Sequence, residues 1–362
     1  MEERLYIKPI LSGKADTRPL IIAGPCSAES EEQLIATALE LAGEGRTDIF
    51  RAGVWKPRTR PGSFEGAGED ALPWIANAAL KTGIPAAIEI AAPKHAEIAL
   101  KHNINIFWLG ARTVVNPFLV QDLADALKGN DVAVMVKNPV NPDLNLWIGA
   151  IERLHDAGIH RLAAIHRGFS HFESAPLRNK PLWEIPISLK RQFKNLPVFT
   201  DPSHICGNRS MLQEIAQKAL DLEMDGLMVE THCNPDAALT DAAQQVDPQT
   251  LSALLDSLTI RSAYAEQSFE HLVAPLRAII DEKDQELLNV LSSRFSAVEA
   301  IGKLKDEHHV TILQLKRWNQ IIETRLEDAT KFGISKEFMK RLLSLLHEES
   351  IRLQEKIFKG EE

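Results

Sequence analysis

Four residues spread along the chain have side chains of the kinds that bind metal ions. They offer one thiol, one imidazole and two carboxylates, and they are Cys26, His204, Glu230 and Asp241. This mixture of soft and hard ligands suits one divalent transition metal ion (Mn, Fe, Co or Zn) and does not suit Ca or Mg. Such an ion polarises a carbonyl group as a Lewis acid. A buried structural cysteine with unrelated acids is the alternative interpretation, and the residues alone leave both open.

A second group of side chains is cationic. Residues 51–66 hold four Lys or Arg side chains within ten positions, interleaved with proline and glycine, although the whole chain has a formal net charge of −9. The two prolines exclude a regular helix there, because each lacks a backbone donor. A stiff basic loop suits a small anion such as a phosphate, held by forked guanidinium donors and a hydroxyl. An ordinary solvated basic loop is the alternative.

A fold must position these groups, and from Pro19 onward short apolar runs alternate with helix-like stretches such as Glu31–Leu41 and Pro117–Leu127. Eight strand–helix units within about 240 residues match the number and length of an α/β (β/α)8 TIM barrel. A doubly wound open sheet is the rival, but it normally has a glycine-rich phosphate loop after its first strand, which is missing here. The predicted strands are Leu20–Cys26, Asp48–Val54, Ala86–Ala91, Ile106–Ala111, Val132–Lys137, Arg161–Gly168, Pro197–Asp201 and Gly226–Thr231.

The barrel predicts where the chemistry lies, because barrel enzymes carry their active sites where the strands exit into loops at the C-terminal face. A reactive or charged residue closes each predicted strand. In chain order these residues are Cys26, Arg51 with Lys56, Glu89, Arg112, Lys137, Arg167, His204 and Glu230. The cations exceed what one phosphate needs. We therefore expect two anionic substrates, or one substrate that carries both a phosphate and a carboxylate.

Length and composition narrow the class of protein. A chain of 362 residues exceeds what one core usually holds, so two domains are expected. The net negative charge argues against nucleic acid as the main partner. Three widely spaced cysteines predict no disulfide framework, and no apolar stretch predicts a membrane segment or a signal peptide. We expect a cytoplasmic protein with neither nucleic-acid nor membrane partners.

Several motifs at the predicted strand ends resemble those of one enzyme family. They are Ala23-Gly-Pro-Cys-Ser-Ala-Glu29, Arg51 followed by Lys56-Pro-Arg-Thr59, Gly110-Ala-Arg112, Lys137, His166-Arg-Gly168, Asp201-Pro-Ser-His204 and Asp225-Gly-Leu-Met-Val-Glu230. Together they resemble 3-deoxy-D-arabino-heptulosonate 7-phosphate (DAHP) synthase of the type I beta subgroup. The resemblance implies a metal-dependent transferase that condenses phosphoenolpyruvate with erythrose 4-phosphate, at the entry to the shikimate pathway of aromatic amino-acid biosynthesis.

The resemblance also implies roles for individual residues. Cys26, His204, Glu230 and Asp241 would bind the metal. Lys56 would lie between the two substrates, with Arg58 and Thr59 facing erythrose 4-phosphate. Asp201 and Ser203 would shape the floor of the site. The residues expected to hold phosphoenolpyruvate are Arg51, Lys56, Arg112, Lys137 and Arg167. A related synthase of 3-deoxy-D-manno-octulosonate 8-phosphate is the rival, but its version of the Lys56–Thr59 loop contains Asn.

The sequence changes character after about Thr259: glycine becomes rare and Pro275 is the last proline. Roughly 264–305, 311–331 and 335–358 read as three helices, the third capped by Ser335. A first helix of about 40 residues would be about 60 Å long at 1.5 Å per residue. That is too long for a monomeric three-helix core, so we expect a homo-oligomer, at least a dimer, through this part.

The C-terminal part resembles the all-helical chorismate mutases. The matching positions are Leu276-Arg277, Leu291-Ser-Ser-Arg294, Ile301-Gly-Lys-Leu-Lys305, Arg317, Ser350 and Gln354. The resemblance implies an isomerase that rearranges chorismate to prephenate. This rearrangement needs only cations that bind the two carboxylates of chorismate and donors to the ether oxygen whose bond breaks.

Residue roles follow from this resemblance as well. Arg294, Arg317 and a partner chain's Arg277 would bind carboxylates, while Lys305 and Gln354 would face the ether oxygen. Ser350 would share the helix face of Gln354. The bacterial pattern has an acid where Gln314 and Trp318 stand here, so we expect modest mutase activity.

We therefore interpret the chain as a bifunctional enzyme. The predicted domains are a barrel at 1–262, a linker with helical character at 263–274 and a mutase domain at 275–362. The alternative keeps the synthase and makes the helical tail a non-catalytic dimerisation or feedback-sensing module. Because the segment before the barrel is short, we also expect the mutase domain to sense prephenate or chorismate and to restrain the synthase allosterically.

Overall fold

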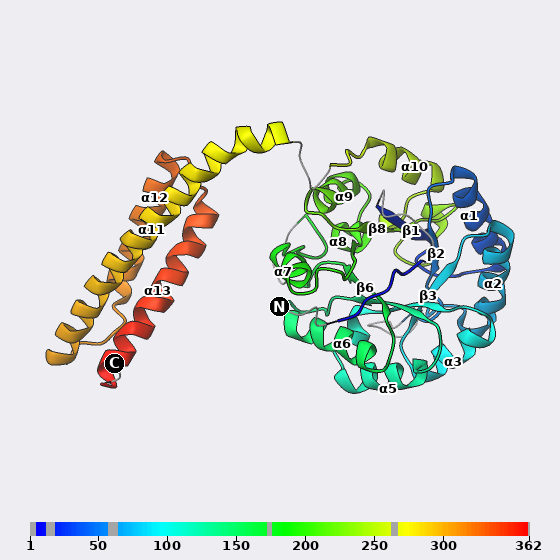
Figure 1. The fold of residues 1–362 in the computed structure, drawn as a ribbon, viewed down its shortest axis with the longest axis horizontal. Helices are drawn as coiled ribbons and strands as arrows, with labels where there is room; N and C mark the ends of the chain where they lie inside the picture. The colour runs from blue at the N-terminus through cyan, green and yellow to red at the C-terminus, as the bar shows by residue number, and fades with distance from the viewer. Residues whose placement is uncertain (1–4, 12–18, 57–63, 172–175, 262–266, 361–362) are drawn as a thin grey trace. The chain divides into compact units, whose positions relative to one another are not determined.

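The computed structural model describes residues 5–11, 19–56, 64–171, 176–261 and 267–360. The chain divides into two compact units, Met1–Ala263 and Tyr264–Glu362. The N-terminal unit is an eight-stranded parallel barrel and the C-terminal unit is helical (Figure 1). Among the described residues, no helix is both long and apolar enough to cross a membrane.

The barrel closes in simple sequential order, β1 to β8, with β8 paired to β1. Its strands are β1 Leu20–Gly24, β2 Ile49–Ala52, β3 Ala86–Ile90, β4 Ile106–Leu109, β5 Ala133–Lys137, β6 Arg161–His166, β7 Val198–Thr200 and β8 Gly226–Glu230. Each falls within one of the eight apolar runs, so the predicted (β/α)8 architecture is confirmed.

Helices connect successive strands around the outside of the barrel (Figure 1). Side-chain caps begin several of them, as where Ser30 accepts from the amide of Gln33 at the start of α1. The principal helices of this unit are α1 Glu31–Glu44, α2 Ala71–Thr82, α3 Pro93–Lys101, α4 Ala111–Val114, α5 Pro117–Leu127, α6 Leu144–Asp156, α7 Glu184–Gln192, α8 Pro202–Cys206, α9 Leu212–Asp221 and α10 Pro248–Ser257.

Alternation along each strand separates two buried clusters and positions the polar groups. One cluster, which includes Ile49, Met135 and Met228, fills the barrel, while the other packs under the helices. Two residues after each of these three comes a charged residue of the same strand: Arg51, Lys137 and Glu230. Because side chains two apart share a face of a strand, these charged groups sit directly above the apolar interior.

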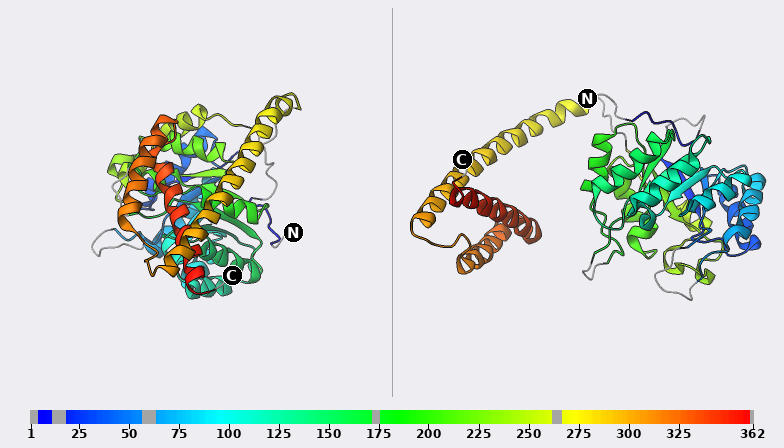
Figure 2. Two further views of the ribbon diagram at one scale, coloured as in Figure 1. Left: turned by 90° about the vertical axis from the view of Figure 1, so that its left-hand side faces the viewer. Right: turned by 90° about the horizontal axis from the view of Figure 1, so that it is seen from below.

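The C-terminal unit consists of α11 Gln267–Glu307, α12 Leu315–Lys331 and α13 Lys336–Phe358. Helix α11 contacts α13, and both helices can be followed by colour, yellow-orange and red, in Figure 2. Ser335 caps α13 as predicted, by accepting from the amide of Phe338. Helix α12 begins four residues later than predicted, because the chain reverses through a left-handed His309 and the ammonium of Lys305 then binds the carbonyl of Ile312.

The long helix leaves much of its apolar stripe uncovered within one chain. Val298 is buried, whereas other members are about half exposed or more: Leu276 at 61%, Ile280 at 58% and Leu287 at 53%. Apolar side chains at this spacing usually pack against another surface.

Candidate active sites

The predicted barrel residues gather at the C-terminal ends of the strands. Lys137 and Glu230 are the last residues of β5 and β8, Arg51 lies within β2, and Arg112 lies in α4, the short helix after β4. His204 does not end a strand: β7 stops at Thr200 and His204 lies in α8. Asp201 caps that helix by accepting from the amide of His204 at 3.0 Å. Arg58 and Thr59 lie outside the described residues.

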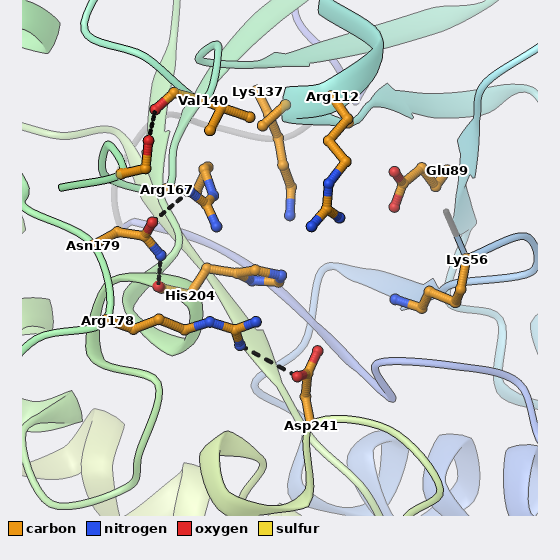
Figure 3. Close-up of a pocket in the computed structure, with 13 residues that line it drawn as sticks. Lys56, Glu89, Arg112, Lys137, Val140, Arg167, Arg178, Asn179, His204 and Asp241 are labelled. Atoms are coloured by element: carbon orange, nitrogen blue, oxygen red, sulfur yellow. Dashed lines mark hydrogen bonds and ion pairs between the residues drawn. The ribbon is translucent and has the colours of Figure 1, made fainter. Parts of the chain in front are cut away.

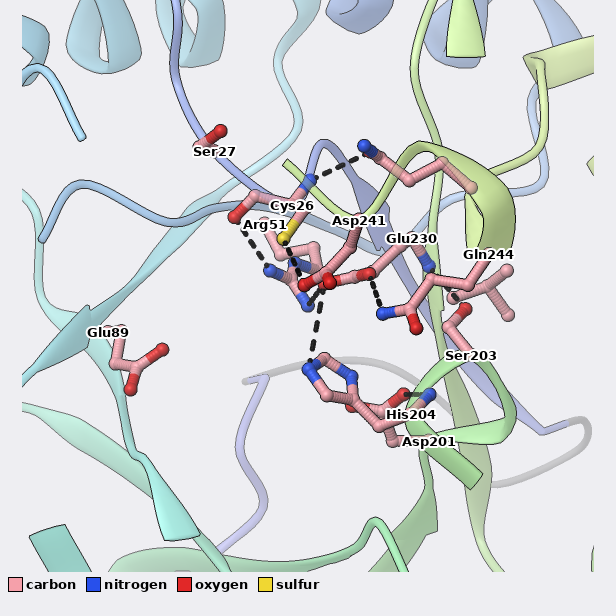
Figure 4. A network of polar contacts seen from close by, with 12 residues as sticks. Cys26, Ser27, Arg51, Glu89, Asp201, Ser203, His204, Glu230, Asp241 and Gln244 are labelled. Atoms are coloured by element: carbon pink, nitrogen blue, oxygen red, sulfur yellow. Dashed lines mark hydrogen bonds and ion pairs between the residues drawn. The ribbon is translucent and has the colours of Figure 1, made fainter. Parts of the chain in front are cut away.

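A thiol and two carboxylates converge at the seam between β1 and β8. Ligand atoms of Cys26, Glu230 and Asp241 all lie within 4.8 Å of one another (Figure 4). The thiol of Cys26 contacts Asp241 Oδ2 at 3.4 Å. Asp241 has a left-handed backbone, with φ 47°, a conformation that aspartate tolerates better than most residues. The structure thus brings three of the four predicted metal ligands together.

His204 lies at the edge of this cluster. Its Nε2 is 3.8 Å from Glu230 Oε1, while its Nδ1 is 2.8 Å from Asp201 Oδ2. Asp201 also receives the ammonium of Lys137 at 2.9 Å. Burial, together with the charge of Lys137, lowers the pKa of His204, so its imidazole is neutral at neutral pH. A neutral imidazole oriented by a carboxylate is the form that binds metal ions.

Two cations face the cluster. Lys56 Nζ is 3.2 Å from Cys26 Sγ, and Arg51 Nη1 is 3.3 Å from Glu230 Oε1. Arg51 also lies over the ring of Trp108, 4.8 Å from its centroid. Among the described residues, the buried atoms Glu230 Oε1 and Arg51 Nη1 form an ion pair but neither makes a hydrogen bond. A donor set of thiol, carboxylates and nearby imidazole, with a buried carboxylate oxygen that accepts no hydrogen bond, fits a transition-metal ion.

Burial and the neighbouring charges set the protonation states of the cluster. Burial and the adjacent carboxylates raise the pKa of Cys26 to about 12. Burial on its own would raise the pKa of Glu230, but His204, Arg51 and Lys56 lower it to about 2. Burial would also raise the pKa of Asp201, but His204 and Lys137 hold it well below its usual range. The thiol is therefore protonated beside two carboxylates, and a coordinated divalent cation would be expected to displace its proton.

A cavity of about 380 Å³ opens above this cluster. In Figure 3, three cations lie on one side of His204: Arg112, Lys137 and Arg167. Asp241 lies on the opposite side of His204. Burial lowers the pKa of Arg167 to about 10, which still leaves it charged at neutral pH. Glu89 also lines the cavity, where it accepts from the indole of Trp108 at 3.2 Å. Ser203 lies beneath, with its hydroxyl accepting from the amide of Glu230.

Sequence reasoning missed three residues of this site. Arg178 and Asn179 lie between β6 and α7 and line the cavity, and Gln244 contacts Glu230 from the loop after β8. Arg178 and Asn179 come more than ten residues after the end of β6 and belong to no recognisable motif, so the sequence did not indicate that they reach the site. Gln244 is three residues after Asp241, and that proximity to a predicted ligand was the available signal.

The helical unit brings together a second group of predicted residues. Arg294 of α11 donates to the hydroxyl of Ser350 of α13 at 3.0 Å. Gln354 is one turn further along α13, buried, and its side-chain oxygen has no hydrogen-bond partner among the described residues. Gly302 of α11 lets α13 approach, since a Cβ there would lie 3.0 Å from Gln354 Cγ. Lys305 lies on the same helix as Arg294 and its pKa is lowered by partial burial.

Trp318 and His347 form a stacked pair near this group. Their ring centroids are 3.8 Å apart and their planes differ by 12°. Partial burial and the charges of Arg294 and Lys305 lower the pKa of His347. The position that departs from the mutase pattern is thus filled by an aromatic stack.

Two further predicted residues are not brought to this group within one chain. Arg277 forms an exposed ion pair with Glu270, and Arg317 donates to Gln320 on its own helix.

Fold and site together define a (β/α)8-barrel enzyme with a cavity lined by cationic side chains, joined to an all-helical unit. The chain belongs to the DAHP synthetase I family, whose model matches residues 4–264. Residues 276–355 match the chorismate mutase type II family model. The interpretation as a synthase barrel followed by a helical mutase segment is therefore confirmed at the level of families.

Known proteins similar to the chain agree with this assignment. A phospho-2-dehydro-3-deoxyheptonate aldolase of Thermotoga maritima is 31% identical, over 66% of this chain and 68% of that protein. A crystal structure of a Thermotoga maritima protein of the same name gives a TM-score of 0.59 at 27% identity, covering 72% of this chain and 70% of that one. A 2-dehydro-3-deoxyphosphooctonate aldolase of Desulfotalea psychrophila is 26% identical, over 68% of this chain and 91% of that protein.

The helical part has a separate relative. A T-protein of Haemophilus influenzae is 31% identical over 83 residues, which are 23% of this chain and 22% of that protein.

Proposed function

We propose that the barrel condenses phosphoenolpyruvate with erythrose 4-phosphate to form 3-deoxy-D-arabino-heptulosonate 7-phosphate, and that it requires one divalent transition-metal ion. The observation that carries this proposal is the convergence of a thiol–carboxylate cluster with several cations around one cavity. Two phosphorylated substrates repel each other, and a cation-lined cavity offsets that repulsion while holding them within reacting distance.

The chain's own residues have distinct tasks in this proposal. Arg51, Lys137 and Arg167 bind the phosphate and carboxylate of phosphoenolpyruvate, with Arg112 at the same side of the cavity. Lys56 lies between the two substrates and extends over Cys26. Cys26, His204, Glu230 and Asp241 would hold the metal ion, which when bound supplies Lewis-acid polarisation of the aldehyde. Ser203 and Asp201 keep Glu230 and His204 in place through the contacts described above.

Replacing Cys26 by alanine tests this proposal. We expect Cys26→Ala to lose bound metal, measured by elemental analysis, and to lose synthase activity by a factor of about 100 or more, since a metal ligand is removed. Cys233→Ala is the matched control because Cys233 is also a free cysteine but contacts the carbonyl of Gln33 instead of the cluster. Full activity of metal-free Cys26→Ala would contradict the proposal.

The sugar substrate has a rival because of the similarity to octulosonate aldolases. The segment Lys56-Pro-Arg-Thr59 favours the four-carbon sugar. Offering erythrose 4-phosphate and arabinose 5-phosphate in parallel decides between them. We expect higher kcat/KM for erythrose 4-phosphate, and the reverse preference would reassign the barrel.

We propose that the helical unit rearranges chorismate to prephenate. Arg294, with Ser350, would bind one carboxylate, and Lys305 and the side-chain amide nitrogen of Gln354 would donate to the ether oxygen. Arg317 and a partner chain's Arg277 would complete the carboxylate contacts. A non-catalytic dimerisation or sensing module is the alternative. Absence of prephenate above the uncatalysed rate, with the full chain and chorismate, would favour that alternative.

A homodimer through the helical unit fits the exposed apolar side chains of α11. We expect a mass of at least twice that of one chain in light scattering.

We also propose that prephenate or chorismate bound to the helical unit restrains the synthase. Measuring synthase rates with and without prephenate would test this. The cytoplasm is the compartment in which we expect both reactions to occur, in keeping with three free cysteines.

A further inference from the structure

Two adjacent residues between β6 and α7, Arg178 and Asn179, contact residues on both sides of the barrel site. Arg178 Nη1 donates to Asp241 Oδ1 at 3.2 Å and to Gln244 Oε1 at 2.9 Å. Gln244, itself buried, donates from Nε2 to Glu230 Oε2 at 2.6 Å. One guanidinium therefore reaches both carboxylates of the cluster, one directly and the other through an amide (Figures 3 and 4).

Asn179 extends in the opposite direction. Its side-chain oxygen accepts from Arg167 Nη1 at 2.8 Å, and its side-chain nitrogen donates to the carbonyl of His204 at 2.6 Å. Asn179 is 5% exposed, so both hydrogen bonds are shielded from water. Of the two residues, Asn179 thus faces the anion-binding side of the cavity, and Arg178 faces the thiol–carboxylate side.

The backbone around this pair is built to hold it close. The amides of Arg178 and Asn179 donate to the carbonyls of Cys206 and Ile205 in α8. Gly207 and Gly168 both have left-handed backbones and both leave room for the pair. A Cβ on Gly207 would lie 2.6 Å from Arg178 Cβ, and a Cβ on Gly168 would lie 2.9 Å from Asn179 Cβ. A side chain at either glycine would push the pair away from α8.

Asp241 has particular need of such support. Its left-handed backbone is a sparsely populated conformation that persists only when its surroundings hold it. Asp241 receives a hydrogen bond from Cys26 on one oxygen and from Arg178 on the other, so Arg178 decides which oxygen faces the thiol.

We propose that Arg178 and Asn179 are positioning residues for the barrel reaction. Arg178 orients the carboxylates of Asp241 and Glu230 toward the metal-binding position, and Asn179 orients the guanidinium of Arg167 toward phosphoenolpyruvate. The pair thereby sets the relative geometry of the metal-binding and anion-binding sides of the cavity. This inference rests on the proposed synthase function.

The test separates the two tasks in the full-length protein. Arg178→Met keeps an unbranched stem against Gly207 and removes every donor. We expect it to weaken Co²⁺ or Mn²⁺ binding about 10-fold or more, as loss of partners of metal ligands typically does, while the KM for phosphoenolpyruvate at saturating metal changes less than about twofold. Arg178→Lys, which keeps the charge, should recover part of the affinity. The thiolate-to-cobalt absorption band reports Cys26 directly.

Asn179→Ala should show the opposite pattern, a KM for phosphoenolpyruvate raised about 10-fold with a smaller change in metal affinity. Arg46→Met is the matched control because Arg46 pairs with Asp256 at an exposed position away from the cavity. Equal shifts of both constants in both variants, accompanied by lowered melting temperatures, would indicate a merely structural role and overturn the inference. Unchanged constants would overturn it as well.

The wild-type protein distinguishes this failure from failure of the proposed function. If wild type binds neither Co²⁺ nor Mn²⁺, the proposed metal dependence falls and this inference falls with it. If wild type binds metal and Arg178→Met binds it equally well, only this inference is overturned.

Discussion

The barrel and the helical unit solve the problem of holding charged groups together in different ways. In the barrel, Arg51, Lys137 and Glu230 are at most 4% exposed and extend from strands over an apolar interior. In the helical unit, Arg294 and Ser350 meet across two helices, and many apolar side chains of α11 are exposed. The described residues of the barrel site meet within one chain, whereas Arg277 and Arg317 of the helical unit form contacts with their own helices.

This difference separates the two sites energetically. Buried charges must be compensated locally, so the barrel site is one network in which each group depends on its neighbours. Long cationic side chains on half-exposed helices depend much less on one another. We therefore expect barrel substitutions to affect stability and function together, and helical substitutions to affect function with little loss of stability.

Replacing Arg294 by alanine should have the largest effect on catalytic activity among these predictions. Removing one preorganised cation from a charge-binding site typically costs a factor of about 100 to 1,000 in kcat. We expect mutase turnover to fall by that factor and synthase turnover to stay unchanged, measured on the same sample of full-length protein. Equal loss of both activities would show that the two sites are not separate.

Replacing Lys137 by methionine should destabilise the barrel strongly. Lys137 and Asp201 are both buried and 2.9 Å apart, and the change leaves Asp201 with His204 alone. Breaking a buried ion pair on one side costs about 3–5 kcal/mol. Urea unfolding followed by near-UV circular dichroism gives the loss. A loss below about 1 kcal/mol would mean that the barrel charges are no more coupled than those of the helices.

Acidification should unfold the barrel before the helical unit. The pKa of Glu230 falls from 4.5 to about 2 in the folded barrel, mainly through His204 and Arg51 acting against burial. The folded state therefore binds fewer protons than the unfolded state, and the stability present above pH 4.5 is lost as the pH falls through 4.5 toward 2. Hydrogen exchange resolved by peptide, with correction for intrinsic rates, would show the order. Earlier opening of α13 than of β8 would contradict it.

Replacing Arg352 by alanine should have the smallest effect. Arg352 pairs with Glu349 one turn away on α13, with side chains 55% and 36% exposed. Exposed pairs of this kind contribute about 0.5 kcal/mol or less. The melting temperature of the helical unit should therefore stay within about 4 °C of wild type. A larger fall would show that charges on the helices are coupled as tightly as those in the barrel.

Much of the fold was predictable because its signals are local. Each strand of the barrel is a short apolar run, and Arg51, Lys137 and Glu230 are placed by the alternation of their own strands. The position of His204 could have been improved, since Asp201 followed by Pro202 is a helix-start signature that predicts α8. The late start of α12 was harder to predict because the hydrogen bond of Lys305 to Ile312 depends on how the chain turns.

The supporting residues of the site could not be predicted in the same way. Arg178 meets Asp241 across 63 positions in the sequence, and neither residue lies in a periodic segment. Arg178 acquires its role from the approach of a loop to Gly207, and glycine alone does not indicate what will pack against it. The predicted site residues belong to recognisable sequence motifs. The residues that support them, such as Arg178, are brought to the site by tertiary contacts and have no motif.

The seam of the barrel has a consequence for the order in which the protein is made. Cys26 lies two residues beyond Gly24, and Gly24 pairs with Glu230, so the cluster joins the first strand to the last. A nascent chain on the ribosome exposes its thiol about two hundred residues before its carboxylate partners are synthesised. The assembled cluster is thus a mark of a finished barrel, and an unfinished chain cannot present it.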